Sequence, residues 1–349
     1  MTARRISDFG ISIGKLPRGP RNALTDVPGV AVGHCTVRTQ AWNTGVTVIL
    51  PAQDNLFLHK VVGACQVLNG FGKTLGLMQL EELGTIETPI ALTNTLNVGL
   101  VHDALVQYSI DQGHAAGVEV ESVNPIVCEC NDAGLSDIQH RAIGYAQVME
   151  AISSAGADFA QGCVGAGTGT VCHSLKGGIG SASRLLEVDG KTYALGVLVQ
   201  TNHGMLSDLR IDGAPVGREI ASGILQEKVD KGSCIVVVGT DLPLSDRQLK
   251  RVLRRAAVGL ARVGSYIGHG SGEVVVGFST ANRVHRQEAR GVVQQTLLNE
   301  ERIDLPFRAC AEAVEEAILN SLAAAETTVG PTGAKKTALA DLWGARNGQ

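Results

Sequence analysis

Gly232 and Ser233 place a small nucleophile just before an apolar segment, 235–238, whose four branched residues are typical of a buried strand. Cleavage of the peptide bond before Ser233 would give this serine a free α-amine. Such an amine has an ordinary pKa of about 7.7–8.0 and could accept the hydroxyl proton, so that one residue supplies both nucleophile and base. Gly232 would permit the strained backbone that an N-to-O acyl shift requires. Taken alone, the dipeptide also fits an ordinary turn at a strand edge.

Ser271 and Glu273 form a second candidate group, in a turn that leads into the apolar segment 274–278. Residues two apart in an extended chain point the same way, so a hydroxyl and a carboxylate there could orient a neighbouring nucleophile. The alternative is a capped turn with an exposed glutamate. Cys234, the residue after Ser233, should point away from Ser233 and pack, which argues against a role as nucleophile.

Glycine-rich stretches and cysteines offer less. The stretches 165–169, 177–181 and 268–273 lack the spacing of a phosphate-binding loop, so tight turns between packed strands are expected. The eight cysteines are scattered and include no pair of C-x-x-C motifs. We therefore expect no zinc or other metal site, no cofactor, and reduced thiols.

Composition excludes several functional classes. The 349 residues carry a net charge of −4, which gives no electrostatic case for a nucleic-acid partner. No apolar run reaches the roughly 18 residues of a membrane span, and the first six residues lack a signal-peptide pattern. A cytoplasmic protein without a membrane partner is expected. Hydrophobic residues make up 44% but aromatics only 3%, so aliphatic side chains must fill the core.

The elements that would position these residues follow from apolar patterning. Segments 193–199, 235–238 and 274–278 are predicted to be strands buried on both faces. Segments 246–263 and 308–325 have the spacing of amphipathic helices. A layered sandwich with sheets inside and helices outside fits this pattern, and no linker divides the chain. The tail after Val329 is expected to be poorly ordered at points.

Six short blocks occur in a characteristic order along the chain. They are 22–34 (NALTDVPGVAVGH), 45–51 (GVTVILP), 164–169 (VGAGTG), 176–180 (KGGIG), 248–251 (QLKR) and 270–273 (GSGE). Together they resemble the L-aminopeptidase/D-amidase/esterase family of self-processing serine peptidases, which includes the β-peptidyl aminopeptidases. The resemblance runs from about Ile6 to Leu342.

The resemblance implies a fold and a maturation step. The fold would be a single-domain, four-layer αββα sandwich of the N-terminal-nucleophile hydrolases, spanning 1–349. The chain would cut itself into an α chain, 1–232, and a β chain, 233–349, and four such αβ units would form a tetramer. Its substrates would be short peptides, amides or esters with L-α, D- or β-amino acyl groups.

The resemblance also implies residue roles. Ser233 would be the nucleophile released by cleavage after Gly232, assisted by Ser271 and Glu273. Asn202 would stabilise the oxyanion, which can contribute roughly 3–4 kcal/mol.

Two further residues match the family's substrate-binding positions. Glu129 would bind the free amine of the substrate. Asn131 stands where some relatives have an aromatic residue, which leaves the preference for α- or β-amino acids open.

Two other functions are compatible with parts of the sequence. Ornithine acetyltransferases share the self-cleaving mechanism, but they use threonine where this chain has Ser233. A glycine-rich protein that binds a small molecule and never cleaves itself is the second alternative.

Overall fold

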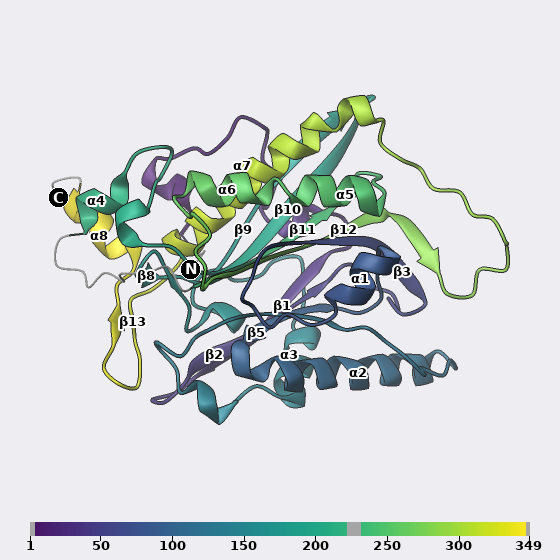
Figure 1. Cartoon of the computed structure of the whole chain (residues 1–349), viewed down its shortest axis with the longest axis horizontal. Helices are drawn as coiled ribbons and strands as arrows, with labels where there is room; N and C mark the ends of the chain where they lie inside the picture. The colour runs from purple at the N-terminus through teal and green to yellow at the C-terminus, as the bar shows by residue number, and fades with distance from the viewer. Residues whose placement is uncertain (1–3, 222–231, 347–349) are drawn as a thin grey trace.

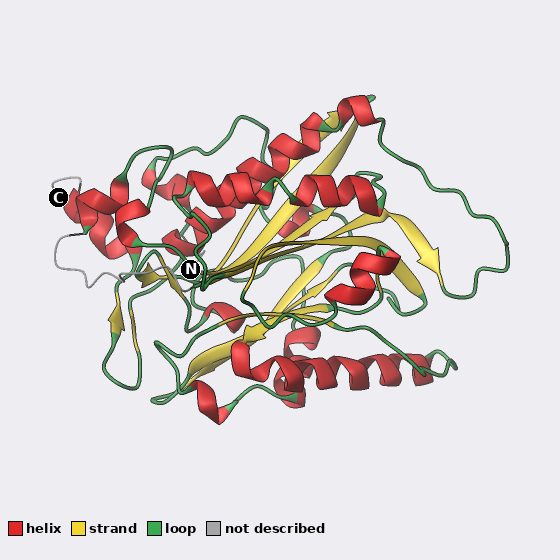
Figure 2. Ribbon diagram, in the orientation of Figure 1, coloured by secondary structure: helices red, strands yellow, loops and turns green. Residues whose placement is uncertain are grey.

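Two stacked β-sheets form the centre of the molecule, and helices cover both outer faces (Figures 1 and 2). The computed structural model describes residues 4–221 and 232–346. The order in the smaller sheet is β1-β2-β5-β6, and in the larger it is β4-β3-β12-β11-β10-β9. Helices α5, α6 and α7 lie over the larger sheet, whereas α2 and α3 lie under the smaller one. The predicted four-layer αββα sandwich is thereby confirmed.

The strands of the smaller sheet are β1 (Ala31–Arg38), β2 (Asn43–Leu50), β5 (Ile90–Asn94) and β6 (Ile126–Cys130). Those of the larger sheet are β3 (His59–Gly70), β4 (Thr85–Ile86), β9 (Ile179–Val188), β10 (Lys191–Asn202), β11 (Ser233–Thr240) and β12 (Gly272–His285). Two small hairpins pair β7 (Val171–Cys172) with β8 (Leu175–Lys176) and β13 (Thr328–Val329) with β14 (Lys335–Lys336).

The α-helices are α1 (Leu77–Leu83), α2 (Val98–Ala115), α3 (Tyr145–Ser153), α4 (Val216–Ile220), α5 (Asp246–Leu253), α6 (Ala256–Arg262), α7 (Asp304–Ala323) and α8 (Leu339–Arg346). None of the helices in the described part of the chain combines the length and apolar character that a bilayer crossing needs.

Strand β11 explains why its sequence is continuously apolar. Ile235 and Val237 lie in the core between the two sheets, while Val236 and Val238 lie in the core under α5–α7. Successive residues of a strand point to opposite faces, so a strand covered on both sides needs apolar residues at every position. Cys234 lies on the helix side with Val236 and is completely buried, as predicted.

The helix predicted over 246–263 is interrupted. Its apolar stripe is buried as expected, but α5 ends at Leu253 and α6 begins at Ala256. The break falls at Arg254 and Arg255, and the Arg255 guanidinium lies 3.6 Å from the ring centre of Phe307 on α7. The second predicted helix, 308–325, is α7.

The C-terminal tail forms regular structure as far as Arg346, contrary to the prediction, and residues 347–349 lie outside the described part of the chain. Residues 328–336 form the β13–β14 hairpin, and α8 follows. Trp343 of α8 packs edge-on against Phe9, with ring centres 5.3 Å apart. This contact attaches the tail to the N-terminal segment.

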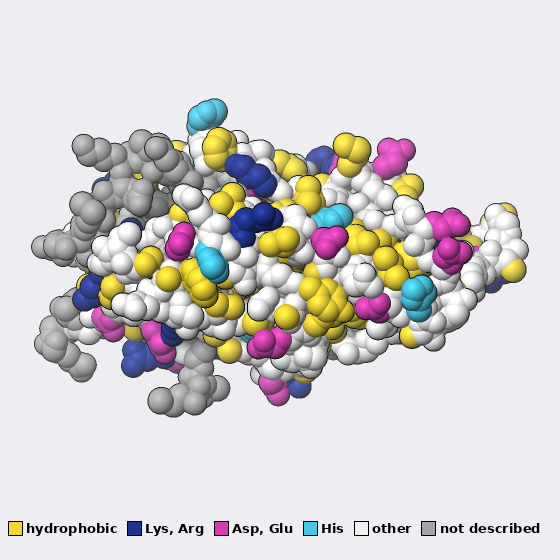
Figure 3. Space-filling model, turned by 90° about the horizontal axis from the view of Figure 1, so that it is seen from below, with side chains coloured by type: hydrophobic (Ala, Val, Ile, Leu, Met, Phe, Trp, Pro, Cys, Tyr) yellow, Lys and Arg dark blue, Asp and Glu magenta, His cyan; other side chains and the backbone are white. Residues whose placement is uncertain are grey.

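The outer face seen from below carries no field of one charge. Acidic, basic and hydrophobic side chains are interspersed there (Figure 3). Such a mixed surface agrees with the low net charge of the sequence.

Candidate active site

Three neighbouring strands of the larger sheet bring the nucleophile candidate and the oxyanion candidate together. Asn202, the last residue of β10, pairs with Ser233, the first residue of antiparallel β11. Ser233 also pairs with Gly272, the first residue of parallel β12. The register of the sheet therefore assembles a site from segments that are far apart in the sequence.

Gly232 lies tightly against this strand end. An added Cβ at position 232 would stand 1.8 Å from the Asn202 carbonyl oxygen and 2.6 Å from the Cα of His203. The Gly272 N–H donates a hydrogen bond of 3.1 Å to the Gly232 carbonyl oxygen. The carbonyl at the proposed cleavage point is thus polarised by a fixed backbone donor.

The carboxamide of Asn202 has a defined orientation. Its Oδ1 accepts a hydrogen bond of 2.8 Å from the N–H of Val171, the first residue of β7. This bond fixes which end of the carboxamide is the oxygen. The other end, Nδ2, carries the N–H groups that can donate to another group. An amide N–H is the donor that an oxyanion requires.

Ser271 and Glu273 form a buried pair next to Ser233. The Ser271 Oγ donates a short hydrogen bond to Glu273 Oε1, and both side chains are completely buried. The alternative of an exposed glutamate is therefore wrong. Asn69 holds the preceding turn by donating 3.0 Å to the Gly268 carbonyl and a shorter bond to that of Ser271.

Glu129 comes from the other sheet, one residue before the end of β6. Its Oε1 accepts 2.9 Å from the Lys73 N–H, and Thr95 donates a short bond to Oε2. The Lys73 ammonium turns away and donates to the Phe71 carbonyl. The buried carboxylate of Glu129 thus has neutral donors, and no cationic side chain of the described residues forms a salt bridge with it.

Glu129 and Ser233 lie near each other across the sheet interface. The Sγ of Cys130 lies 3.5 Å from the carbonyl oxygens of both Ser233 and Gln200. Gly72 lies between the two sides: an added Cβ there would be 3.5 Å from Glu129 Oε1 and 3.8 Å from the Cα of Gly272.

Asn131 is not shown to join this group. Its side chain is exposed, and its Oδ1 accepts 3.0 Å from the N–H of Ala133 in the turn after β6. Asp132, the next residue, is buried and bonded to Thr44 and Asn94 instead. Burial raises the pKa of Asp132 to about 6.

Several residues of the site escaped sequence reasoning. Thr95 and the backbone of Lys73 hold Glu129, and the backbone of Val171 orients Asn202. Backbone donors leave no trace in residue type, and a single threonine after a strand is common, so no sequence signal distinguishes them.

Two solved structures share the complete fold. The L-aminopeptidase D-Ala-esterase/amidase of Ochrobactrum anthropi, described as a variant of the Ntn hydrolase fold, superposes with a TM-score of 0.90 at 34% identity and covers 96% of this chain and 95% of its own. The PH0078 protein of Pyrococcus horikoshii OT3 superposes with a TM-score of 0.92 at 45% identity, covering 99% of both chains. The chain thus has the mixed α/β fold of the Ntn hydrolases.

The family follows from the sequence match. The family model described as peptidase family S58 matches residues 22–336. The beta-peptidyl aminopeptidase BapA of Sphingosinicella microcystinivorans is 37% identical over 355 aligned positions, covering 94% of this chain and 88% of that protein. The chain belongs to peptidase family S58 and is an aminopeptidase. This confirms the prediction from the six blocks and argues against both alternative functions.

Proposed function

We propose that the chain cleaves its own Gly232–Ser233 bond and then removes N-terminal residues from short peptides, amides or esters, with Ser233 as nucleophile. The observation that carries this proposal is the register of three strand ends, which sets Asn202 and Gly272 on either side of Ser233. The resulting fragments would be 1–232 and 233–349.

Self-cleavage would begin at the bond before Ser233. The Ser233 Oγ attacks the Gly232 carbonyl carbon, the hydroxyl proton passes to the departing Ser233 nitrogen as the C–N bond breaks, and an ester replaces the amide. Negative charge on the Gly232 oxygen is stabilised by the Gly272 N–H, already 3.1 Å away. Water then hydrolyses the ester, which leaves a carboxylate on Gly232 and a free α-amine on Ser233.

Peptide hydrolysis would reuse the same atoms. The Ser233 Oγ attacks the first carbonyl of the substrate, and the α-amine of Ser233 accepts the hydroxyl proton, with the Ser271–Glu273 pair assisting. The Nδ2 of Asn202 and the Gly272 N–H, vacated by Gly232, donate to the oxyanion. The leaving amine departs protonated, and water hydrolyses the acyl ester to regenerate Ser233.

Glu129 would define the aminopeptidase specificity. A substrate ammonium paired with its carboxylate fixes the scissile carbonyl one residue away. The relative from Sphingosinicella is named as a β-peptidyl aminopeptidase, which makes β-amino acyl groups candidate substrates beside L-α and D-amino acyl groups. Asn131, exposed beside this strand end, would contribute to the rim of the amine pocket.

Assembly and location complete the proposal. Four processed units would form a tetramer with a mass of four times the chain's 36.4 kDa, which light scattering measures directly. A cytoplasmic location is supported by the absence of disulfides among the eight cysteines, all of which lie in described residues.

The test compares peptide amides with free and acetylated N-termini. The wild type should release the first residue only from the free-amine substrates, for both α- and β-amino acyl groups offered. Ser233→Ala should release none, whereas Ser233→Thr, which retains a hydroxyl, should keep partial activity. Equal rates on acetylated substrates would contradict the role of Glu129, and an active Ser233→Ala protein would contradict the nucleophile.

A further inference from the structure

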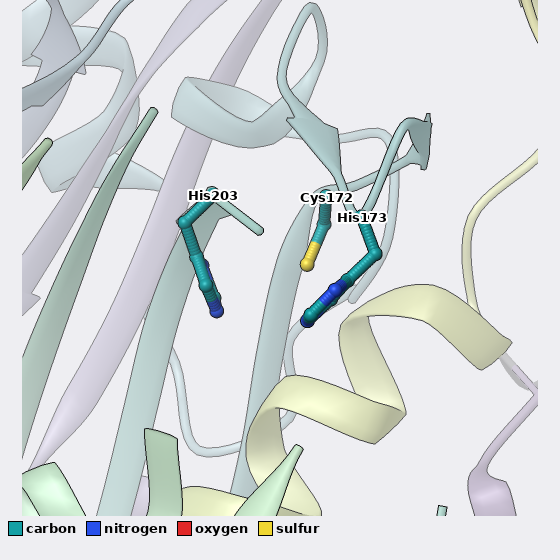
Figure 4. A group of neighbouring side chains, drawn as sticks. All are labelled: Cys172, His173 and His203. Carbon is teal, nitrogen blue, oxygen red and sulfur yellow. The ribbon is translucent and has the colours of Figure 1, made fainter. Parts of the chain in front are cut away.

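A compact group of side chains that could bind a metal lies next to Asn202 in the candidate site. Cys172, His173 and His203 are all buried, and one potential ligand atom from each lies within 4.8 Å of the other two. Figure 4 shows the Cys172 sulfur between the two imidazole rings, with the rings pointing toward a common space. The group forms no paired cysteine motif in the sequence, because its members come from two separate segments.

His203 is the strongest evidence for a ligand. Its side chain is only 2% exposed, yet neither ring nitrogen has a hydrogen-bond partner within the described residues. Buried polar atoms are almost always satisfied, so an imidazole with both nitrogens open requires an explanation.

His173 is held in the orientation of a metal ligand. Its Nδ1 lies 2.9 Å from the carbonyl oxygen of Met205, so Nδ1 carries the proton and Nε2 presents a lone pair. A hydrogen bond from the second nitrogen to a backbone carbonyl is the usual way in which ligating histidines are oriented. Gly204 makes room for the ring, since a Cβ at that position would approach it to 2.4 Å.

We infer that Cys172, His173 and His203 bind one borderline-soft ion such as Zn²⁺. One thiolate and two imidazoles favour such ions, whereas Mg²⁺ and Ca²⁺ prefer oxygen ligands. Ligand atoms of a tetrahedral zinc ion lie about 3.4–3.8 Å apart. Side-chain rotations that move each ligand atom by roughly 1 Å would therefore close the group around the ion. As the Sγ–metal bond forms, Cys172 releases its proton to solvent, and water fills the fourth position.

The ion would act as a positioning element rather than as part of the chemistry. Cys172 follows Val171, whose N–H holds the Asn202 carboxamide, and His203 follows Asn202 itself. A metal joining Cys172 to His203 would therefore link the two segments that fix the position of the Asn202 carboxamide. Bound metal should stabilise the folded chain, because only that state holds the three ligands together.

The experiment uses Ser233→Ala protein, so that its result does not depend on self-cleavage or hydrolysis. Calorimetric titration with Zn²⁺ should give one ion per chain and raise the melting temperature by a few degrees. Co²⁺ should produce the near-ultraviolet absorption of a cobalt–thiolate bond. Cys172→Ser should abolish that absorption, and His203→Gln should weaken binding at least about tenfold. Cys35→Ser, which removes a buried thiol in the smaller sheet, should change neither.

Two results would overturn the inference. One is a protein that binds no Zn²⁺ at stoichiometric concentrations and shows no cobalt–thiolate absorption. The other is binding that survives both Cys172→Ser and His203→Gln, because the ion would then lie elsewhere. If Cys172→Ser fails to fold, the cobalt spectrum of Ser233→Ala protein together with the affinity of His203→Gln decides the question.

Discussion

The two sheets contribute to the site in different ways. In the larger sheet, Asn202, Ser233 and Gly272 are placed by backbone pairing between β10, β11 and β12. In the smaller sheet, the Glu129 side chain is placed by two hydrogen bonds, from the Lys73 N–H and the Thr95 hydroxyl. In the proposed mechanism, bond cleavage would thus depend on strand register, whereas substrate recognition would depend on one buried carboxylate.

This difference separates two kinds of failure. A change that disturbs the three strand ends should impair both self-cleavage and peptide hydrolysis, because both reactions would use the same atoms. A change at Glu129 should impair only the binding of peptides with a free amine. A Glu129 variant that fails to cleave itself, or a strand-end variant that loses only one of the two reactions, would contradict this separation.

The largest effect is expected from Gly272→Ala. The added Cβ would lie 2.7 Å from the Gly72 nitrogen and 3.3 Å from the Ser233 Oγ, so the strand end must shift. Intact chain should accumulate, and activity should fall more than a hundredfold, as gel electrophoresis and peptide assays would show. Gly99→Ala, where an added Cβ meets nothing within 4 Å, is the matched control and should process normally.

Asn202→Ala should follow, with kcat lowered about 10²–10³-fold through loss of the oxyanion donor. Asn202→Asp retains the Oδ1 that accepts from Val171 but removes the donor. If the aspartate variant were as active as the wild type, Asn202 would have only a structural role.

Glu129→Gln changes the one side chain that the smaller sheet contributes to the proposed binding of the substrate amine. Loss of one charge-assisted contact should lower kcat/KM for free-amine peptides about 10–100-fold. Self-cleavage should proceed as in the wild type, because the proposed cleavage step does not use Glu129. If this variant failed to cleave itself, self-cleavage and substrate binding would not be separated between the two sheets.

The smallest effect is expected from Asp132, two residues after the end of β6. Its folded pKa of about 6 exceeds the ordinary value of 3.8, so the folded protein binds this proton more tightly than the unfolded chain does. The stability contribution is therefore complete below about pH 4 and is lost as pH rises through 6. Relative to Asp132→Asn, the wild type should lose unfolding free energy between pH 4 and pH 6 in chemical denaturation. The exposed-site control Asp137→Asn should not show this difference.

The sequence predicts the strands of the larger sheet better than it predicts how they pair. The apolar segments at 193–199, 235–238 and 274–278 are the interiors of β10, β11 and β12. No local pattern shows that Asn202 pairs with Ser233, because register arises from packing across the whole sheet. Only the family resemblance implied that Asn202 and Ser233 belong to one site.

Burial of polar groups was the weakest part of the prediction. A glutamate beside a glycine-rich turn is usually exposed, yet Glu273 is completely buried with Ser271. Cys172 and His203 meet only because β7 packs beside the end of β10, a tertiary contact that spacing rules do not contain. The sequence also did not predict the break in the helix over 246–263. The apolar stripe continues from α5 to α6, so apolar spacing alone does not reveal the interruption at Arg254.

Cleavage between Gly232 and Ser233 can be measured directly from the intact mass of freshly purified wild-type protein under denaturing conditions. Two species, matching residues 1–232 and 233–349, are expected, while Ser233→Ala should give a single full-length mass. A wild-type protein that remains one chain and still hydrolyses peptides, or a Ser233→Ala protein that is cleaved, would contradict the account.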